Sequence, residues 1–140
     1  MAGPLRHTYW VTDRLAAGVH PLVYDDLQRL VDAGFDTFVD LTERATYEVP
    51  GHRHFPIPDM GVPDDVDPIL DAIDEALADG RTVYVHCFAG RGRTGTVIGC
   101  WLARHGATDP LADLAALRAH LDSPSPETAG QRRFVRSHRA

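Results

Sequence analysis

Apolar residues recur along the 140-residue chain in two alternating patterns, one typical of strands and one typical of helices. Strand-type runs cover residues 9–17 (with a turn at Thr12-Asp13), 35–41, 54–57 and 82–86. Helical spacing covers residues 22–31, 66–77, 94–104 and 111–121, and Ser125-Pro126-Glu127 has the cap, proline and acid of a further helix start. The alternation predicts an α/β fold, a three-layer sandwich with a central, mostly parallel sheet flanked by helices. No repeat or long linker divides the chain, so a single domain over residues 1–140 is expected.

Charge and cysteine content limit the partners and the compartment. All 14 basic residues are arginine, and 20 acidic residues give a formal net charge of −6. An acidic protein is a poor general binder of nucleic acid or of anionic membranes, although one local basic pocket remains compatible with this balance. Two cysteines are too few for a disulfide framework, and no apolar run reaches the ~20 residues of a membrane helix. A cytoplasmic protein without integral membrane contact is expected.

The most informative segment follows the strand-type run at residues 82–86. Its sequence is His86-Cys87-Phe88-Ala89-Gly90-Arg91-Gly92-Arg93-Thr94-Gly95. A glycine-rich turn between a strand and a helix aims backbone N–H groups and the positive end of the helix dipole at one point, where an anion can bind. The same N–H groups would stabilise a thiolate at Cys87, and Arg93 can offer two donors to a tetrahedral oxyanion. A thiolate beneath a bound phosphate is placed to attack phosphorus.

A second interpretation of this segment is dinucleotide binding. Residues 90–95 also fit the pattern G-x-G-x-x-G between a strand and a helix. That site requires a second strand ending in an acidic residue about 20 positions later. Around Asp113 the sequence has only leucines at helical spacing, and this interpretation leaves Cys87 and Arg93 without a role. Phosphate chemistry is therefore favoured.

The segment from His86 to Gly95 resembles the signature H-C-x-x-G-x-x-R-[ST]-G of the cysteine-based protein tyrosine phosphatases, and the chain length resembles their compact dual-specificity branch. Looser similarity extends over Leu15–Gly18 with Pro21, Asp40-Leu41-Thr42 and Pro126–Phe134. The resemblance implies a phosphomonoester hydrolase with a phosphocysteine intermediate. It assigns Cys87 as nucleophile, Arg93 as phosphate ligand, Thr94 as the hydroxyl that stabilises the departing thiolate, and His86 as a support of the loop. The phosphate-binding residues would be Phe88, Ala89, Gly90, Arg91, Gly92 and Arg93.

The resemblance also implies a general acid and a residue that orients water. Pro58-Asp59, 28 residues before Cys87, resembles the family's mobile Trp-Pro-Asp loop, with Ile57 where tyrosine-specific members have tryptophan. Asp59 is the expected acid, and Asp64, Asp65 and Asp67 are its rivals, the first two of which suit the start of the next helix. Gln131 resembles the glutamine that orients the hydrolytic water in some members. The alternative interpretation is that Gln131 is a solvent-facing residue of the last helix without a catalytic role.

The expected substrate is a phosphorylated protein or peptide, and the chain is expected to act as a monomer without cofactor or metal. Arg91 inside the loop resembles the phosphoinositide-directed branch, which usually has a lysine after the cysteine where this chain has Phe88. A phosphoinositide phosphatase is therefore one alternative. A phosphate-binding pseudophosphatase without turnover is the other, although Cys87, Arg93 and Asp59 are all present.

Three further features have simpler interpretations. His52-Arg53-His54 alternates like a metal site, but it has no evident acidic partner and is expected to be exposed. Cys100 is expected in the core, with a disulfide to Cys87 as the alternative. The last helix is basic, through Arg132, Arg133, Arg136 and Arg139, and is expected to be a solvated face, with docking of anionic substrates as the alternative.

Overall fold

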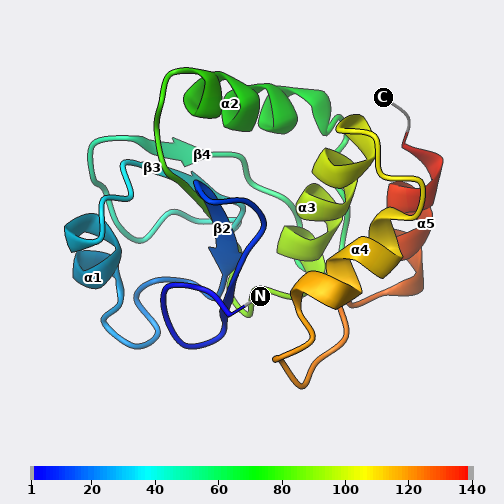
Figure 1. Cartoon of the computed structure of the whole chain (residues 1–140), viewed down its shortest axis with the longest axis horizontal. Coiled ribbons are helices and arrows are strands. Elements are labelled where there is room, and N and C mark those ends of the chain that lie inside the picture. Colours follow the sequence, from blue (N-terminus) through cyan, green and yellow to red (C-terminus); the bar gives the residue numbers. More distant parts are fainter. Residues whose placement is uncertain (1, 139–140) are drawn as a thin grey trace.

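The computed structural model describes residues 2–138, which form one mixed sheet and five helices (Figure 1). The elements in chain order are β1 (Thr8–Trp10), β2 (Leu15–Gly18), α1 (Leu27–Asp32), β3 (Thr37–Asp40), β4 (His52–His54), α2 (Asp67–Ala78), β5 (Val83–His86), α3 (Gly92–Arg104), α4 (Pro110–Leu117) and α5 (Ala129–Ser137).

Strand β5 lies at the centre of the sheet, whose order is β1-β2-β5-β3-β4. It pairs in parallel with β2 on one side and with β3 on the other, and β3 pairs in parallel with β4. Among the strands of residues 2–138, only β1 is antiparallel to its neighbour. The carboxyl ends of β2, β3 and β5 therefore meet at one edge of the sheet, where Gly18, Asp40 and His86 lie in register. The predicted α/β class with a mostly parallel sheet is confirmed.

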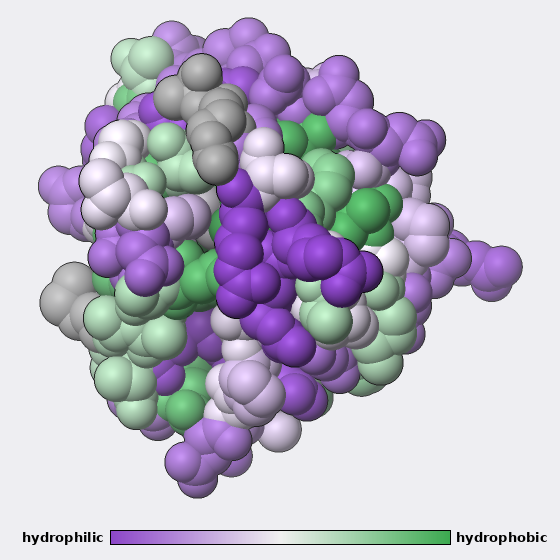
Figure 2. Space-filling view, turned by 90° about the vertical axis from the view of Figure 1, so that its right-hand side faces the viewer, coloured by the Kyte–Doolittle hydropathy of each residue, from purple (hydrophilic) through white to green (hydrophobic). Residues whose placement is uncertain are grey.

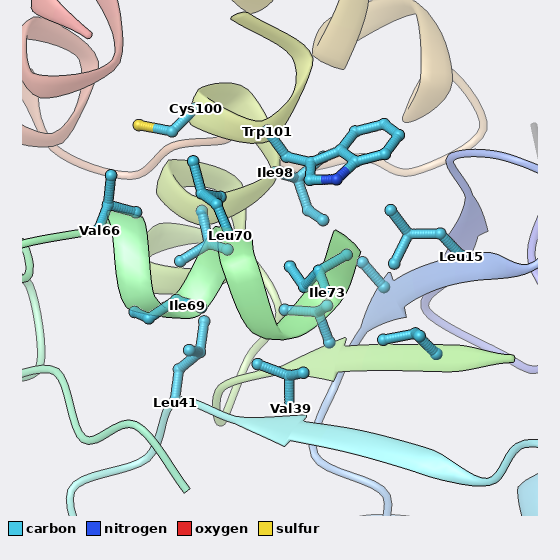
Figure 3. Packing of buried hydrophobic residues seen from close by; sticks show 14 of the residues in the cluster. Leu15, Val39, Leu41, Val66, Ile69, Leu70, Ile73, Ile98, Cys100 and Trp101 are labelled. Atoms are coloured by element: carbon cyan, nitrogen blue, oxygen red, sulfur yellow. The ribbon is translucent and has the colours of Figure 1, made fainter. Parts of the chain in front are cut away.

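Each face of the sheet has its own hydrophobic layer. On the larger side, α2 and α3 pack on the sheet through Ile69, Leu70, Ile73 and Ile98, as Figure 3 shows. On the other side, Leu30 of α1 packs with residues from the loops and the sheet, among them Phe35, Phe38 and Tyr84. Figure 1 shows α1 on the opposite side of the sheet from α3, α4 and α5, so the predicted three-layer arrangement is present.

Two predicted element starts were wrong. The first helix begins at Leu27 rather than near Leu22, because residues 21–26 form a turn in which the Asp26 N–H bonds to the Pro21 carbonyl (2.7 Å) and Asp25 has a φ of 53°. The last helix begins after Thr128 rather than at Ser125, because Thr128 and Gln131 form a reciprocal capping box.

The predicted short strand at residues 54–57 lies two residues earlier, at His52–His54, and it is the edge strand that the prolines indicated.

Figure 2 views the side of the molecule on which α4 and α5 lie. Hydrophilic side chains cover its middle, and apolar surface appears in separate patches. Arg133 and Arg136 of α5 are exposed, whereas Arg139 lies outside the described residues. Within residues 2–138, no helix is both long and apolar enough to cross a membrane.

Candidate active site

The 87–93 loop leaves the end of β5 and enters α3, and its carbonyl groups are bonded to the surrounding protein. The acceptor and donor pairs are Cys87 O with His86 Nδ1 (3.1 Å), Phe88 O with the His20 N–H (2.9 Å), Gly90 O with Arg118 Nη1 (3.1 Å) and Arg91 O with the Ser125 hydroxyl. Among residues 2–138, no hydrogen bond uses the N–H groups of residues 88–93. The loop therefore fixes its carbonyls to the protein and leaves a row of donors for an anion.

Close packing against β2 explains the glycine at position 90. Gly90 has a φ of 74°, which side-chain-bearing residues rarely adopt. A Cβ atom at this position would collide with the Gly18 carbonyl carbon and lie 2.6 Å from its oxygen. The loop can approach the end of β2 this closely only because position 90 has no side chain.

Arg118 donates a hydrogen bond to the loop, and the sequence analysis did not predict this role. It follows α4 and is 4% exposed, with Nη1 on the Gly90 carbonyl and Nη2 on the Ser123 hydroxyl (2.9 Å). Its guanidinium also lies over the Tyr9 ring, 5.2 Å from the centroid. The sequence did contain an indication of this role. Arg118 stands four residues after Leu114, which is buried, and so falls on the apolar stripe of the helix predicted over residues 111–121. A charged residue on such a stripe indicates a buried polar contact.

A cavity of about 190 Å³ lies over Cys87. Its lining residues are Asp59, Met60, Cys87, Phe88, Ala89, Gly92, Arg93 and Glu127. Arg93 is 6% exposed, and its Nη1 donates to the Ile57 carbonyl (3.2 Å) and the Leu41 carbonyl (3.5 Å). These two bonds hold the guanidinium at the cavity, with Nη2 still available on the side of Asp59.

Asp59 is the only one of the candidate acids that lines this cavity. It lies on a turn closed by the Gly61 N–H on the Pro58 carbonyl (2.8 Å), and its Oδ1 is 3.4 Å from Arg93 Nη2. The rival acids have other positions: Asp65 accepts from the Asp67 N–H (3.0 Å), Asp67 pairs with Arg104 (3.1 Å), and Asp64 is exposed outside the cavity.

Thr94 and Gln131 are both fully buried beside the loop. Thr94 Oγ1 has no hydrogen-bond partner among the described residues. The Gln131 Oε1 accepts from the N–H groups of Glu127 and Thr128 (both 3.0 Å), and its Nε2 donates to the Gly61 carbonyl (3.0 Å). Gln131 is therefore not the solvent-facing residue of the alternative interpretation. It connects α5 to the turn that carries Asp59.

Arg91 does not line the cavity, although its partner Glu127 does. Its Nε donates to the Pro124 carbonyl (3.3 Å), and its Nη1 lies 3.7 Å from Glu127 Oε2. Phe88, in contrast, is 64% exposed at the rim. It also lines a second, wider pocket of about 600 Å³ that adjoins the first through Asp59 and Arg93. The other lining residues of this pocket are His20, Leu22, Val23, Thr42, Glu43, Arg44 and Thr46.

A buried polar network lies behind the loop. Burial lowers the pKa of His86 to about 4, although the neighbouring Asp40 opposes this shift. Burial alone would raise the pKa of Asp40, but His86 and hydrogen bonds from Thr42 and His52 outweigh it and leave that pKa below its ordinary value. His86 is therefore neutral and Asp40 ionised at neutral pH. The Asp40–His52 contact (2.9 Å) corrects the expectation that the His52–His54 segment lacks an acidic partner.

Cys100 lies in the hydrophobic core, as predicted. Burial raises the pKa of its thiol to about 12. It stands eight residues after Gly92 in α3, and a helix rises about 1.5 Å per residue, which places Cys100 about 12 Å along the helix from the loop. Both cysteines are free, and a disulfide spans only about 7 Å between Cα atoms, so the geometry does not support a direct bond to Cys87. Within residues 2–138, no cluster of histidine, cysteine and acidic residues could hold a metal ion.

Comparison with known proteins agrees with this geometry. Residues 17–107 match the family model described as "Polymorphic toxin system, DSP-PTPase phosphatase". The chain belongs to this phosphatase family. The predicted membership of the cysteine-based tyrosine phosphatase superfamily, in its compact dual-specificity branch, is confirmed.

Individual members of the phosphatase family resemble the chain to different extents. It is 30% identical to 067L, a candidate tyrosine phosphatase of Invertebrate iridescent virus 3, over 91% of this chain and 63% of the viral protein. It is 45% identical to the phosphatidylglycerophosphate phosphatase PTPMT1 of Arabidopsis thaliana over 37% of this chain and 18% of that protein. The crystal structure of Tk-PTP in the active form aligns with a TM-score of 0.77 and 26% identity, over 94% of this chain and 95% of that one. The chain thus spans less than two thirds of the length of these two curated relatives.

Proposed function

We propose that the chain hydrolyses phosphomonoesters of proteins, phosphotyrosine above all, through a phosphocysteine on Cys87. The observation that carries this proposal is the juxtaposition of a thiol, a row of unbonded N–H groups and an anchored arginine in one cavity. A non-catalytic phosphate-binding module would not need Asp59 beside Arg93. A nucleophilic thiol acts only when reduced, so a reducing compartment such as the cytoplasm suits this function.

In the first step, the Cys87 thiolate attacks phosphorus, the ester P–O bond breaks, and Asp59 gives its proton to the leaving oxygen. The N–H groups of the 87–93 loop and the Arg93 guanidinium stabilise the charge on the three remaining oxygens. The bound phosphate takes the place of the Asp59 carboxyl group on Arg93 Nη2.

In the second step, a water attacks phosphorus, the S–P bond breaks, and Asp59 takes the proton of the water. The unpartnered Thr94 hydroxyl is a donor for the thiolate that leaves. The Gln131 amide has one N–H beyond its bond to Gly61, and its Nε2 would lie 2.9 Å from a Cβ atom at Gly92, so it is close enough to the loop to hold the water.

We expect Asp59→Asn to lower kcat/KM about 100-fold with phenyl phosphate, since kcat/KM reports the formation of the phosphocysteine and general acid catalysis contributes roughly 10²–10⁴-fold. The loss should be much smaller with p-nitrophenyl phosphate, because that leaving group departs without a proton. The limb of the kcat/KM profile on which the rate falls as the pH rises should also disappear. Asp64→Asn, in the same segment but outside the cavity, is the matched control and should resemble the wild type. An equal loss with both leaving groups would contradict the role of Asp59.

The adjoining 600 Å³ pocket favours an aryl phosphate as substrate. Leu22, Val23 and Phe88 are exposed there, so a phosphate on Cys87 would have its ester group beside apolar surface. A phospholipid headgroup is the second candidate, because the chain resembles PTPMT1 and has Arg91 in its loop. The pairing of Arg91 with Glu127 argues against it, since the arginine is then not free to bind a second phosphate.

This preference is tested by comparing kcat/KM for four substrates. They are a phosphotyrosine peptide, a phosphoserine peptide, and phosphatidylglycerophosphate and a phosphoinositide in mixed micelles. The phosphotyrosine peptide should be preferred by at least about tenfold, and Phe88→Ala should remove most of that margin because a buried aromatic contact contributes roughly 1–2 kcal/mol. A higher kcat/KM for either lipid would overturn the protein substrate and leave the Cys87 chemistry intact.

A further inference from the structure

We propose that Tyr47 is a positioning residue for the 87–93 loop: its hydroxyl group donates to His86 Nε2 and keeps the single ring proton of His86 on Nδ1, where it holds the Cys87 carbonyl. Tyr47 lies in the segment between β3 and β4, far from the loop in sequence. The resemblance of residues 86–95 to the phosphatase signature assigns no role to Tyr47.

The ring of His86 has two different partners, one at each nitrogen. Nδ1 lies 3.1 Å from the Cys87 carbonyl oxygen, and Nε2 lies 2.6 Å from the Tyr47 hydroxyl. A carbonyl can only accept, so this contact requires the proton on Nδ1. In a neutral ring Nε2 is then an acceptor, and Tyr47 must be the donor. Both partners are satisfied by this one tautomer.

Asp40 is the competitor for that proton. Its Oδ1 lies 3.9 Å from His86 Nε2, on the neighbouring strand in register with His86. A buried carboxylate is a strong acceptor, and an Nε2–H tautomer would turn its proton towards Asp40. That tautomer would place the Nδ1 lone pair against the Cys87 carbonyl oxygen. The Tyr47 hydroxyl lies 1.3 Å closer to His86 Nε2 than the Asp40 carboxylate does, and its donated hydrogen bond prevents the change of tautomer.

The other groups around His86 are compatible with this assignment. Asp40 already accepts three hydrogen bonds, two from Thr42 (2.6 and 3.0 Å) and one from His52 (2.9 Å), so it does not depend on His86. The His20 and Tyr84 rings contact His86 only through their faces or edges, with centroids 5.0 and 5.8 Å away. Burial also raises the pKa of Tyr47, so its hydroxyl keeps its proton.

The tautomer can be measured without any turnover. In protein labelled with ¹⁵N-histidine at pH 7, the ring nitrogen shifts of His86 distinguish a protonated Nδ1 from a protonated Nε2, and loss of the signals in His86→Asn assigns them among the eight histidines. The wild type should have the Nδ1–H form, and Tyr47→Phe should move the ring towards the Nε2–H form. Tyr84→Phe is the matched control, because it removes another buried hydroxyl, which donates to the Val19 carbonyl, and should leave the Nδ1–H form unchanged.

The consequence for Cys87 rests on the proposed function and has its own readout. Loss of one neutral hydrogen bond at the loop should slow iodoacetamide alkylation of Cys87, and lower kcat/KM, by about tenfold in Tyr47→Phe relative to Tyr84→Phe. A wild-type ring with its proton on Nε2, or a Tyr47→Phe ring that keeps the proton on Nδ1 with unchanged alkylation, would overturn the proposal. If the tautomer shifts as expected but no phosphomonoester is hydrolysed, the proposed function fails and the role of Tyr47 stands.

Discussion

Replacement of Cys87 by serine is expected to lower kcat on the order of 10⁴-fold or more, because it removes the nucleophile on which both steps depend. A serine hydroxyl in the same place is a far weaker nucleophile than a cysteine sulfur. The measurement is steady-state turnover of p-nitrophenyl phosphate and of a phosphotyrosine peptide, each with and without chelator. Chelator should leave the wild-type rate unchanged.

The other cysteine provides the control. Cys100→Ala changes a buried thiol in the core and should retain the wild-type kcat, at some cost in stability. Cys87→Ser should still bind the phosphotyrosine peptide, because Arg93 and the loop N–H groups remain. Turnover by Cys87→Ser at more than a few per cent of the wild-type rate would contradict the mechanism, and loss of binding would indicate a damaged loop instead.

The second large effect is expected for Arg93→Lys. Arg93 uses Nη1 on the Leu41 and Ile57 carbonyls and has Nη2 at the cavity, so one planar group is both anchored and available to phosphate. A lysine keeps the positive charge but cannot make both sets of bonds. We therefore expect kcat/KM to fall on the order of 10³-fold, as when a principal oxyanion donor is removed.

Arg91→Lys is the matched control for this substitution. Arg91 is the other arginine of the loop, but its side chain contacts Pro124 and Glu127 and does not line the cavity. Its kcat/KM with a phosphotyrosine peptide should stay within about threefold of wild type, since a partly exposed ion pair contributes less than about 1 kcal/mol. A small loss in Arg93→Lys together with a large loss in Arg91→Lys would reverse the assignment of the phosphate ligand.

Local sequence patterns were sufficient for the strand, loop and helix around Cys87. The apolar run before His86 and the glycines at 90 and 92 are properties of neighbouring residues, so periodicity and turn chemistry predicted their conformation. The start of α1 was mispredicted, because the apolar side chains of Leu22 and Val23 fit helical spacing while the backbone at Asp25 does not continue a helix. These two residues line the pocket beside the loop instead.

The groups that hold the loop from behind could not be predicted in the same way. Arg118 reaches the Gly90 carbonyl across 28 residues of sequence, and Tyr47 reaches His86 across 39. Such contacts depend on how the layers of the fold pack together. In a single sequence, the only indication of them is a polar residue at a position that the apolar pattern predicts to be buried. Asp40 was such a residue, since it ends a strand whose four positions are all buried.

The central claim is that phosphate passes through Cys87, and the most direct test is to isolate that intermediate. With p-nitrophenyl phosphate, the activated leaving group should make formation of the phosphocysteine faster than its hydrolysis. An alkaline denaturing quench during turnover, followed by peptide mass spectrometry and ³¹P NMR, should find one phosphoryl group bonded to sulfur on the peptide that contains Cys87. Full turnover with that peptide unmodified, or with the phosphoryl group on another residue, would contradict the account.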